Sequence, residues 1–496
     1  MGMDAQGQTV AQTPDLRHKG RPVSKDYASF MLCKRLIALL AAPAFLLGGC
    51  RTFQSLGDHT AATLGLADDV PRTYTASEES QARHHGIVVA DEPLAARAGA
   101  AALAAQGNAV DTVTTIFFTL AATYPVAAGL GGGGICLVSE PGGRVVEFDF
   151  LAKAPRRAGA YALPGAVAGF AAMHRLYGAL PWQRAVAPGE AYAATGFPVS
   201  QALAVRLAAA QNIIRLDAAL AAQFLDETGQ PRAAGADVKN PALGQTLSEV
   251  RRSGADGFYK GAVAARLVAY SNAQGGAITA EELAAITARQ GAARSHNMGG
   301  LVTWLPGAQT GAGAFSASLV NNLSRGNARN AQGMTAAAVQ QSLAAFGTPG
   351  VPGDLGSTGF AAVDADGQAA ACAMTLNGPF GAGRTATGTG VVLAANPSGP
   401  AGVASAFLTP VIAMRGGAAS LVGSGAGGPN GAAAAIAAVL DVARGRALSK
   451  RGDLRGSGSA PYDAVNMISC EGEVCVALPD PGGHGAASAV TDPLPP

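Results

Sequence analysis

The chain has 496 residues, of which 49% are hydrophobic, 14% are charged and 67 are glycine. A chain this long and apolar buries a substantial core in one or two domains, and its composition excludes an intrinsically disordered protein. The formal net charge is only +2. The sequence has no basic patch interleaved with aromatic residues, so we expect no nucleic-acid partner.

Residues 1–49 are expected to be an N-terminal extension and a signal peptide. From Met31 the chain reads MLCKRLIALLAAPAFLLGGC, in which two basic residues precede an apolar run and small residues, as is typical of secretory signals. The final LGGC resembles the lipobox of bacterial lipoproteins, which implies cleavage before Cys50 and attachment of lipid to its thiol. Arg51 follows, where an aspartate would suggest inner-membrane retention, so we expect an outer-membrane anchor facing the periplasm. The alternative is a cleaved secretory peptide with an incidental cysteine, and either Met1 or Met31 starts the protein.

Residues 50–80 are interpreted as a tether between the lipid and the folded part. The next segments predict a strand over GIVVAD, a helix over EPLAARAGAAALAAQG and a strongly apolar second helix over NAVDTVTTIFFTLAATYP. Pro93 lies near the start of the first helix and Gly107 at its end, which is the usual placement of these residues. The segment ICLVSEPGGRVVEFDF predicts a hairpin that turns at residues 141–143.

From residue 165 to about residue 290 the pattern is helical, and LVTWLPG predicts a return to strand. A Pro/Gly-rich linker at 347–356 is followed by further predicted strands, a helix over AAAAIAAVLDVARG and a last hairpin. Strands and helices are grouped rather than strictly alternating, which favours antiparallel sheet layers covered by helices. The expected fold class is therefore α+β.

Ser357 comes directly after the linker and directly before a predicted hairpin with strands at 360–363 and 368–376. Local evidence alone favours an ordinary polar turn. The alternative is that Ser357 becomes a chain N-terminus and a nucleophile. A hydroxyl at a new N-terminus has its own α-amine as general base, and the reference pKa of that amine, about 7.7–8.0, is close to working pH.

Four cysteines fall in predicted strands. Cys470 and Cys475 flank EGEV in the last hairpin, where opposed residues are close enough for a disulfide. Cys136 and Cys372 lie in apolar strands and are interpreted as buried thiols. No paired Cys/His spacing is present, so we expect neither a metal nor another cofactor.

Two glycine-rich loops match the dinucleotide-binding spacing GxGxxG, GLGGGG at 129–134 and GSGAGG at 423–428. The first follows a helix and precedes a strand, which is the reverse of a dinucleotide site, and the second lacks a surrounding parallel βαβ unit. The second loop precedes a helix, so its backbone N–H groups could bind an oxyanion.

These segments together resemble, in order, the γ-glutamyltransferases, also called glutathione hydrolases. GIVVADEPLAARAGAAALAAQGNAVDT and EFDFLAKAP resemble the start of the large subunit, and STGFAAVDADGQAAACAMTLNGPFGAG resembles the start of the small subunit. The resemblance covers residues 86–496 and implies the N-terminal-nucleophile hydrolase fold, a four-layer αββα sandwich. Residues 81–356 and 357–496 would share this one domain, and self-cleavage would fall between Gly356 and Ser357.

The resemblance also implies the roles of individual residues. The nucleophilic threonine of the family falls on Ser357, which keeps the hydroxyl and loses the methyl group. The other matched positions are Thr375, which holds the nucleophile, Asn377 and Asn396 for substrate binding, and the oxyanion glycines Gly427 and Gly428.

The substrate pocket departs from the family pattern. Leu151 takes the slot of the arginine that grips the γ-glutamyl carboxylate, and Lys153, on the same strand face, is the candidate substitute. The acidic ligand of the amine falls near Gly399, and two paired serines fall near Ala406 and Phe407. The γ-glutamyl pocket is therefore expected to be largely lost.

Two functions follow. The first is a self-processing amidohydrolase, a heterodimer of its own fragments, that acts on a γ-glutamyl-like or other small amide or peptide. The alternative is a catalytically degenerate relative that serves as a periplasmic binding or scaffold lipoprotein.

The lipobox predicts that Cys50 attaches the protein to the membrane. The protein is expected to partition into the detergent phase of a Triton X-114 extract, and Cys50→Ala is expected to move it to the aqueous phase, because the lipid supplies most of the apolar surface for binding. A Cys50→Ala variant that stays equally membrane-bound would show that the anchor assignment is wrong.

Overall fold

The computed structural model describes residues 84–140, 143–325, 331–348, 351, 353–450, 453–454, 462–472 and 474–491. The signal peptide, Cys50 and the tether at 50–80 lie outside these residues, as do two of the three residues predicted to turn the 141–143 hairpin. Among the described helices, none is both long and apolar enough to cross a membrane.

The strands form two large sheets in which every neighbouring pair is antiparallel. The first sheet has the order β17 (Ala486–Thr491), β1 (His84–Ala90), β9 (Ser357–Asp364), β10 (Ala369–Thr375), β2 (Gly133–Ser139), β3 (Val145–Asp149) and β6 (Arg289–Ala292). The second has the order β16 (Val474–Leu478), β15 (Ala464–Glu471), β14 (Ala418–Ala426), β13 (Thr409–Arg415), β8 (Leu301–Leu305) and β7 (Arg294–Met298). Two short pairs complete the described strands: β11 (Thr385–Ala386) with β12 (Val391–Val392), and β4 (Phe197–Pro198) with β5 (Asp237–Val238).

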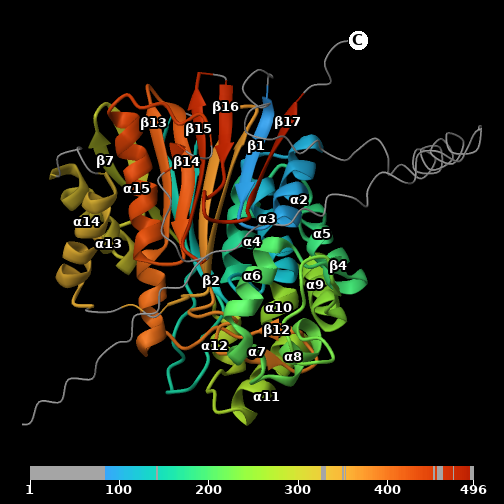
Figure 1. Cartoon of the computed structure of the whole chain (residues 1–496). Coiled ribbons are helices and arrows are strands. Elements are labelled where there is room, and N and C mark those ends of the chain that lie inside the picture. The colour runs from blue at the N-terminus through green and yellow to red at the C-terminus, as the bar shows by residue number, and fades with distance from the viewer. Residues whose placement is uncertain are drawn as a thin grey trace, which may run out of the picture. The chain divides into compact units, whose positions relative to one another are not determined.

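Helices gather on the two outer sides of the sheets (Figure 1). One side carries α2 (Pro93–Ala104), α3 (Ala109–Thr123), α4 (Ala166–Tyr177), α5 (Trp182–Thr195), α6 (Gln201–Ala209), α7 (Gln211–Ile214), α8 (Ala218–Phe224), α9 (Pro241–Ser253), α10 (Asp256–Tyr259), α11 (Gly261–Ala273) and α12 (Ala280–Ala284). The other side carries α13 (Gly311–Arg325), α14 (Ala331–Phe346), α15 (Pro429–Ala443) and the 3₁₀ helix η2 (Pro400–Phe407).

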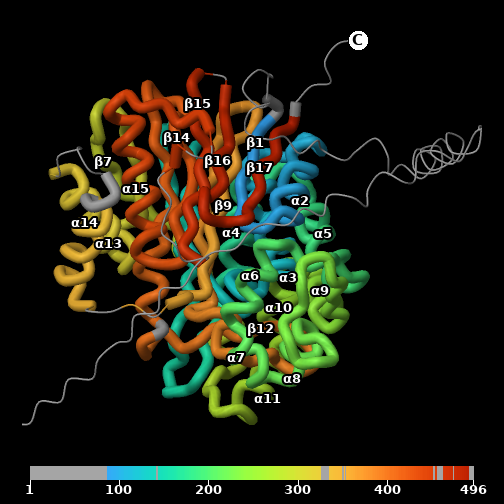
Figure 2. The backbone as a smooth tube through the Cα atoms, viewed as in Figure 1, coloured from blue at the N-terminus to red at the C-terminus, as the bar shows by residue number. Residues whose placement is uncertain are grey.

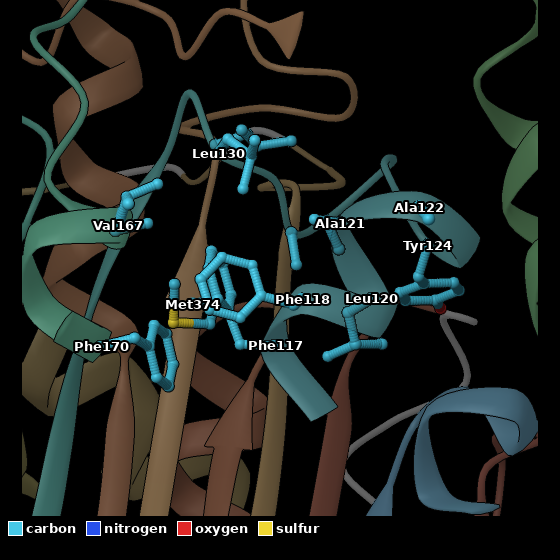
Figure 3. Close-up of a cluster of buried hydrophobic side chains, with 14 of the residues drawn as sticks. Phe117, Phe118, Leu120, Ala121, Ala122, Tyr124, Leu130, Val167, Phe170 and Met374 are labelled. Carbon is cyan, nitrogen blue, oxygen red and sulfur yellow. The ribbon is translucent and has the colours of Figure 1, made fainter. Parts of the chain in front are cut away.

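Three layers of buried side chains hold the sheets and helices together. Between the sheets, Ile87 and Ala361 of the first meet Ile412 of the second. On the outer face of the first sheet, Phe117 of α3 stacks on Phe170 of α4, with ring centroids 4.2 Å apart (Figure 3). A third cluster joins the second sheet to α13, α14 and α15. The arrangement is the α+β, four-layer αββα sandwich predicted from the sequence.

The central strand β9 differs from its prediction at its start. It begins at Ser357, three residues before the predicted strand, because Ser357 pairs directly with Thr375 of β10. The other edge of β9 pairs with β1, so the strand is central in its sheet (Figure 2). Strands β6, β7 and β17 were not predicted from the sequence. One of the strands expected after the linker is present only as the two-residue strand β12.

The interpretation of Cys136 and Cys372 as buried thiols is wrong. They form a disulfide, because β2 and β10 are neighbours in the sheet and the two cysteines are directly opposed, with a Cα–Cα distance of 4.1 Å. Their sequence separation of 236 residues hid this contact. The structure also joins Cys470 to Cys475, the pair predicted from the hairpin pattern.

The two disulfides predict different effects on stability. Replacing Cys136 and Cys372 together by serine is expected to lower the free energy of unfolding by about 2–5 kcal/mol, because the bridge constrains a long loop in the unfolded chain. The matched control, serine at Cys470 and Cys475, is expected to cost less, since that bridge spans only 5 positions. Urea denaturation measures both effects. Free thiols at 136 and 372 in a non-reduced peptide map would contradict the first bridge.

Candidate active site

Ser357 lies in a buried cluster of hydroxyl and carbonyl groups at one end of β9. Its side chain is 1% exposed. The hydroxyl Oγ lies 3.3 Å from the carbonyl oxygen of Leu355 and 3.4 Å from Oγ1 of Thr375. Ser357 has one hydroxyl proton, so it donates to one of these acceptors at a time.

The carbonyl group of Gly356, on the other side of that bond, is surrounded by donors. It accepts a hydrogen bond from the backbone N–H of Leu376 at 3.0 Å. Thr375 Oγ1 lies 3.1 Å from the same oxygen and 3.1 Å from the oxygen of Leu355. The N–H of Asn377 donates to Thr375 Oγ1 at 2.9 Å, which leaves the threonine proton directed to a carbonyl.

Gly356 has a conformation that requires glycine. Its φ is +58°, and a Cβ atom there would lie 1.8 Å from the carbonyl oxygen of Gly378. Asn377 also has a positive φ, of 62°, and its side-chain amide donates to the carbonyl of Ala395 at 2.9 Å. The turn after β10 thus lies directly against Gly356, the residue before Ser357.

Asp91 is a buried carboxylate beside Thr358, the residue after Ser357, and the sequence analysis missed it. Its oxygens accept hydrogen bonds from the hydroxyl of Thr358 and from the side-chain amide of Asn466, both at 2.6 Å. Burial raises the pKa of Asp91 although both hydrogen bonds oppose the shift. The available signal was an aspartate placed directly after a buried strand.

Arg206 and Asp354 form a second buried polar group that the sequence analysis missed. Arg206, on α6, is 1% exposed, and its Nη2 lies 2.7 Å from Oδ1 of Asp354. The same oxygen accepts the N–H of Gly356 at 2.8 Å. The guanidinium group also lies 5.6 Å from the ring centroid of Tyr124. A buried cation is thus joined through one carboxylate to the residue before Ser357.

The predicted oxyanion glycines lie at the start of α15. Gly428 is the N-cap residue of that helix, and a Cβ atom on it would lie 3.9 Å from Leu355 Cδ1, two positions before Ser357. Gly427 has a φ of +88°, and a Cβ atom there would lie 1.8 Å from the oxygen of Tyr462. The structure therefore brings this loop to the linker side of the site.

Of the predicted substrate-binding residues, Asn377 contacts the hydroxyl cluster through its N–H, whereas the structure gives Asn396 and Lys153 other partners. The side chain of Asn396 donates to the carbonyl of Gly159 at 2.6 Å and accepts from the N–H of Ser398 at 2.9 Å, so it joins its own loop to the segment around Gly159. The side chain of Lys153 is exposed, and its backbone pairs with Leu163.

Two positions that the resemblance matched to polar ligands of the substrate hold apolar residues in the structure. Ala406 and Phe407 are buried in the core, and Phe407 packs on Phe315 of α13. Within the described ranges, no group of three or more His, Cys, Asp or Glu side chains could hold a metal ion.

Comparison with known proteins identifies relatives. The model of the gamma-glutamyltranspeptidase family matches residues 95–348, a segment that ends before Ser357. The glutathione hydrolase proenzyme of Escherichia coli is 28% identical over 279 residues, which are 52% of this chain and 47% of that protein. Glutathione hydrolase 2 of Arabidopsis thaliana is 30% identical over 221 residues, 41% of this chain and 38% of that protein. The matches thus span less than half the length of these relatives.

A solved structure shares the fold over most of the chain. The cephalosporin acylase from Bacillus halodurans superposes with a TM-score of 0.66 over 82% of this chain and 96% of its own, at 17% identity. At this identity the likeness shows the fold alone.

Asp463 predicts a pH dependence of stability at this site. It lies beside Gly428, and burial raises its pKa from 3.8 to about 6 although a hydrogen bond from Asn430 opposes the shift. A raised carboxyl pKa favours the folded state at low pH, and this contribution is lost as pH rises from about 4 to about 6. The difference corresponds to roughly 2–3 kcal/mol.

The parent should therefore lose this contribution between pH 4 and pH 7, whereas Asp463→Asn should not. The unfolding free energy of Asp463→Asn minus that of the parent should rise by about 2–3 kcal/mol over this range. Urea denaturation at a series of pH values measures this difference. Asp237→Asn, at an exposed aspartate, is the control and should change little. A constant difference between Asp463→Asn and the parent at all pH values would contradict the prediction.

Proposed function

Because the chain belongs to the gamma-glutamyltranspeptidase family, we propose that it is a self-processing amidohydrolase with Ser357 as its N-terminal nucleophile. It would first cut its own chain between Gly356 and Ser357. The freed serine would then transfer the acyl group of a small amide or peptide to water or to another acceptor.

The environment of the Gly356 carbonyl is the observation that carries this proposal. Cleavage of a peptide bond places negative charge on its carbonyl oxygen in the transition state, and fixed donors aimed at that oxygen lower the barrier. The Gly356 oxygen has two such groups, the N–H of Leu376 at 3.0 Å and the hydroxyl of Thr375 at 3.1 Å. The attacking hydroxyl belongs to the adjacent residue and is buried with them.

The cleavage step conserves atoms and charge without a cofactor. Ser357 Oγ attacks the carbonyl carbon of Gly356, the new O–C bond replaces the C–N bond, and the hydroxyl proton passes to the departing nitrogen. Water then hydrolyses the ester, which leaves a carboxylate on Gly356 and restores the hydroxyl of Ser357. Ser357 now carries a free α-amine, which is placed to act as general base in later turnovers.

The change from threonine to serine affects the rate more than the chemistry. Serine has more rotamer freedom than a β-branched residue, so its hydroxyl spends less time in the attacking position. Slow or partial processing is the expected behaviour. Glutathione is expected to be a poor substrate, because the ordinary carboxylate and amine ligands are replaced by Leu151, Gly399, Ala406 and Phe407.

Processing predicts a new fragment that begins at Ser357. On a reducing denaturing gel, purified protein incubated for days is expected to separate into two fragments, and N-terminal sequencing of the smaller should start STGFAAV. Without reductant the protein should run as one species, because the Cys136–Cys372 bridge joins the two fragments. Ser357→Ala should remain uncut, and Ser357→Thr should cut at least as fast as the parent.

Thr375 provides a matched test of the donor geometry. Thr375→Val keeps the shape and removes the hydroxyl, and it should slow processing by about 10²–10³. Thr375→Ser keeps the hydroxyl and should process at a rate near that of the parent. A parent protein that stays a single chain after prolonged incubation would overturn the proposal and favour the degenerate scaffold.

A further inference from the structure

The uncut chain contains its own first acyl group. The same Ser357 hydroxyl attacks the Gly356 carbonyl during processing and the substrate carbonyl afterwards, so both carbonyl carbons must occupy nearly one position. The acyl side of the first reaction is the chain that leads back from Gly356 to Leu355 and Asp354. The contacts of these residues therefore indicate what the site accepts as an acyl group.

Asp354 contributes the charged contact of this internal acyl group. Its Oδ1 lies 2.7 Å from Nη2 of the buried Arg206 and accepts the N–H of Gly356. This ion pair joins one guanidinium nitrogen to one carboxylate oxygen. The other two atoms that could form a second, parallel hydrogen bond, Arg206 Nε and Asp354 Oδ2, have no hydrogen-bond partner. A carboxylate that reached Arg206 from a free substrate could engage both nitrogens, as guanidinium and carboxylate geometry favours.

The distance from the scissile carbonyl sets the length of the acyl group. The Gly356 nitrogen is two bonds from its carbonyl carbon and 2.8 Å from the Asp354 oxygen, which places that oxygen within about 5 Å of the carbon. A four-carbon acyl chain with a terminal carboxylate spans this distance, and a five-carbon chain spans it when bent. The simplest match is a succinyl or glutaryl group.

Cutting the chain would let Arg206 lose the carboxylate to which it is hydrogen-bonded. An unpaired buried cation is strongly disfavoured, and cleavage gives residues 354–356 a free end that lets them leave the site. Of the other carboxylates near the guanidinium, Asp91 is bonded to Thr358 and Asn466, and Asp463 is bonded to Asn430. A cavity of about 20 Å³ lies between Arg206, Tyr124, Asp91 and Asp463.

We propose that Arg206 is the acyl-carboxylate receptor of the processed protein and that Asp354 occupies it until the chain is cut. The preferred substrate is an amide of a four- or five-carbon dicarboxylic acid. This inference rests on the proposed function for its catalytic part, whereas the anion site itself does not depend on cleavage.

The catalytic part is tested with a matched pair of 4-nitroanilides on the processed protein. Succinyl and butanoyl anilides have the same carbon count and differ in the terminal carboxylate. The expected kcat/KM ratio is at least about 10 in favour of succinyl, and Arg206→Lys, which keeps the charge without the planar fork, should reduce it several-fold. The γ-glutamyl anilide should be hydrolysed more slowly than the glutaryl anilide. Equal rates for the succinyl and butanoyl anilides in a processed, active protein would overturn the inference and leave the proposed function intact.

The anion site is tested without catalysis in the full chain carrying Ser357→Ala. Adding Asp354→Ala removes the internal carboxylate, so succinate should raise the Tm by about 2 °C or more above sodium chloride at the same ionic strength. The Ser357→Ala parent, with Asp354 in place, should show no such difference, nor should the variant that also carries Arg206→Met. If Asp354→Ala does not fold, Asp354→Asn removes the charge with a smaller change in shape.

The outcomes separate the two proposals. A succinate effect that requires both the loss of Asp354 and the presence of Arg206 supports the anion site even if the parent never cuts itself. An equal response of all three variants overturns the site even if processing occurs at Ser357.

Discussion

The direct pairing of Ser357 with Thr375 is the contact on which the site depends. Residues directly opposed in an antiparallel pair point to the same face, so this register brings the two hydroxyls together. A shift by one residue would turn them to opposite faces. The register is held on both edges of β9, because β1 pairs with one edge and β10 with the other. The core on both faces of this strand thus positions a hydroxyl whose own hydrogen bonds are long.

The same register explains why the residues just before Ser357 lie so close to the end of β10 in the uncut chain. With Ser357 already in the strand, the preceding residues must leave the sheet at once, and Gly356 makes that turn with a φ of +58°. Its carbonyl then points at the end of β10, where the next N–H and the Thr375 hydroxyl meet it. The ion pair between Arg206 and Asp354 holds the linker two residues before Gly356. A buried ion pair of this kind is weak evidence for stability, which favours a role in positioning and recognition.

Features that depend on local sequence pattern or on the family resemblance were predicted from the sequence. The first two helices and the β9–β10 hairpin followed from apolar periodicity and turn residues, whereas the αββα layer order and the roles of Ser357 and Thr375 came from the resemblance. Contacts across the fold could not be predicted this way. The Cys136–Cys372 bridge depends on which strands are neighbours, and the Arg206–Asp354 pair joins residues 148 positions apart. Arg206 in particular reads as a solvated arginine on an amphipathic helix until the tertiary structure buries it.

If the chain is cut after Gly356 as proposed, the bridge between Cys136 and Cys372 has a further consequence for the two fragments. It crosses from one side of the Gly356–Ser357 bond to the other, so each nucleophile-bearing fragment stays bound to the large fragment with which it folded. Their effective concentration is then independent of protein concentration, and dilution cannot separate them. Fragments from different molecules cannot exchange while the bridge is oxidised. In a mixture of parent and variant molecules, each site would keep the sequence of a single gene product, and a reductant would be needed before hybrids could form.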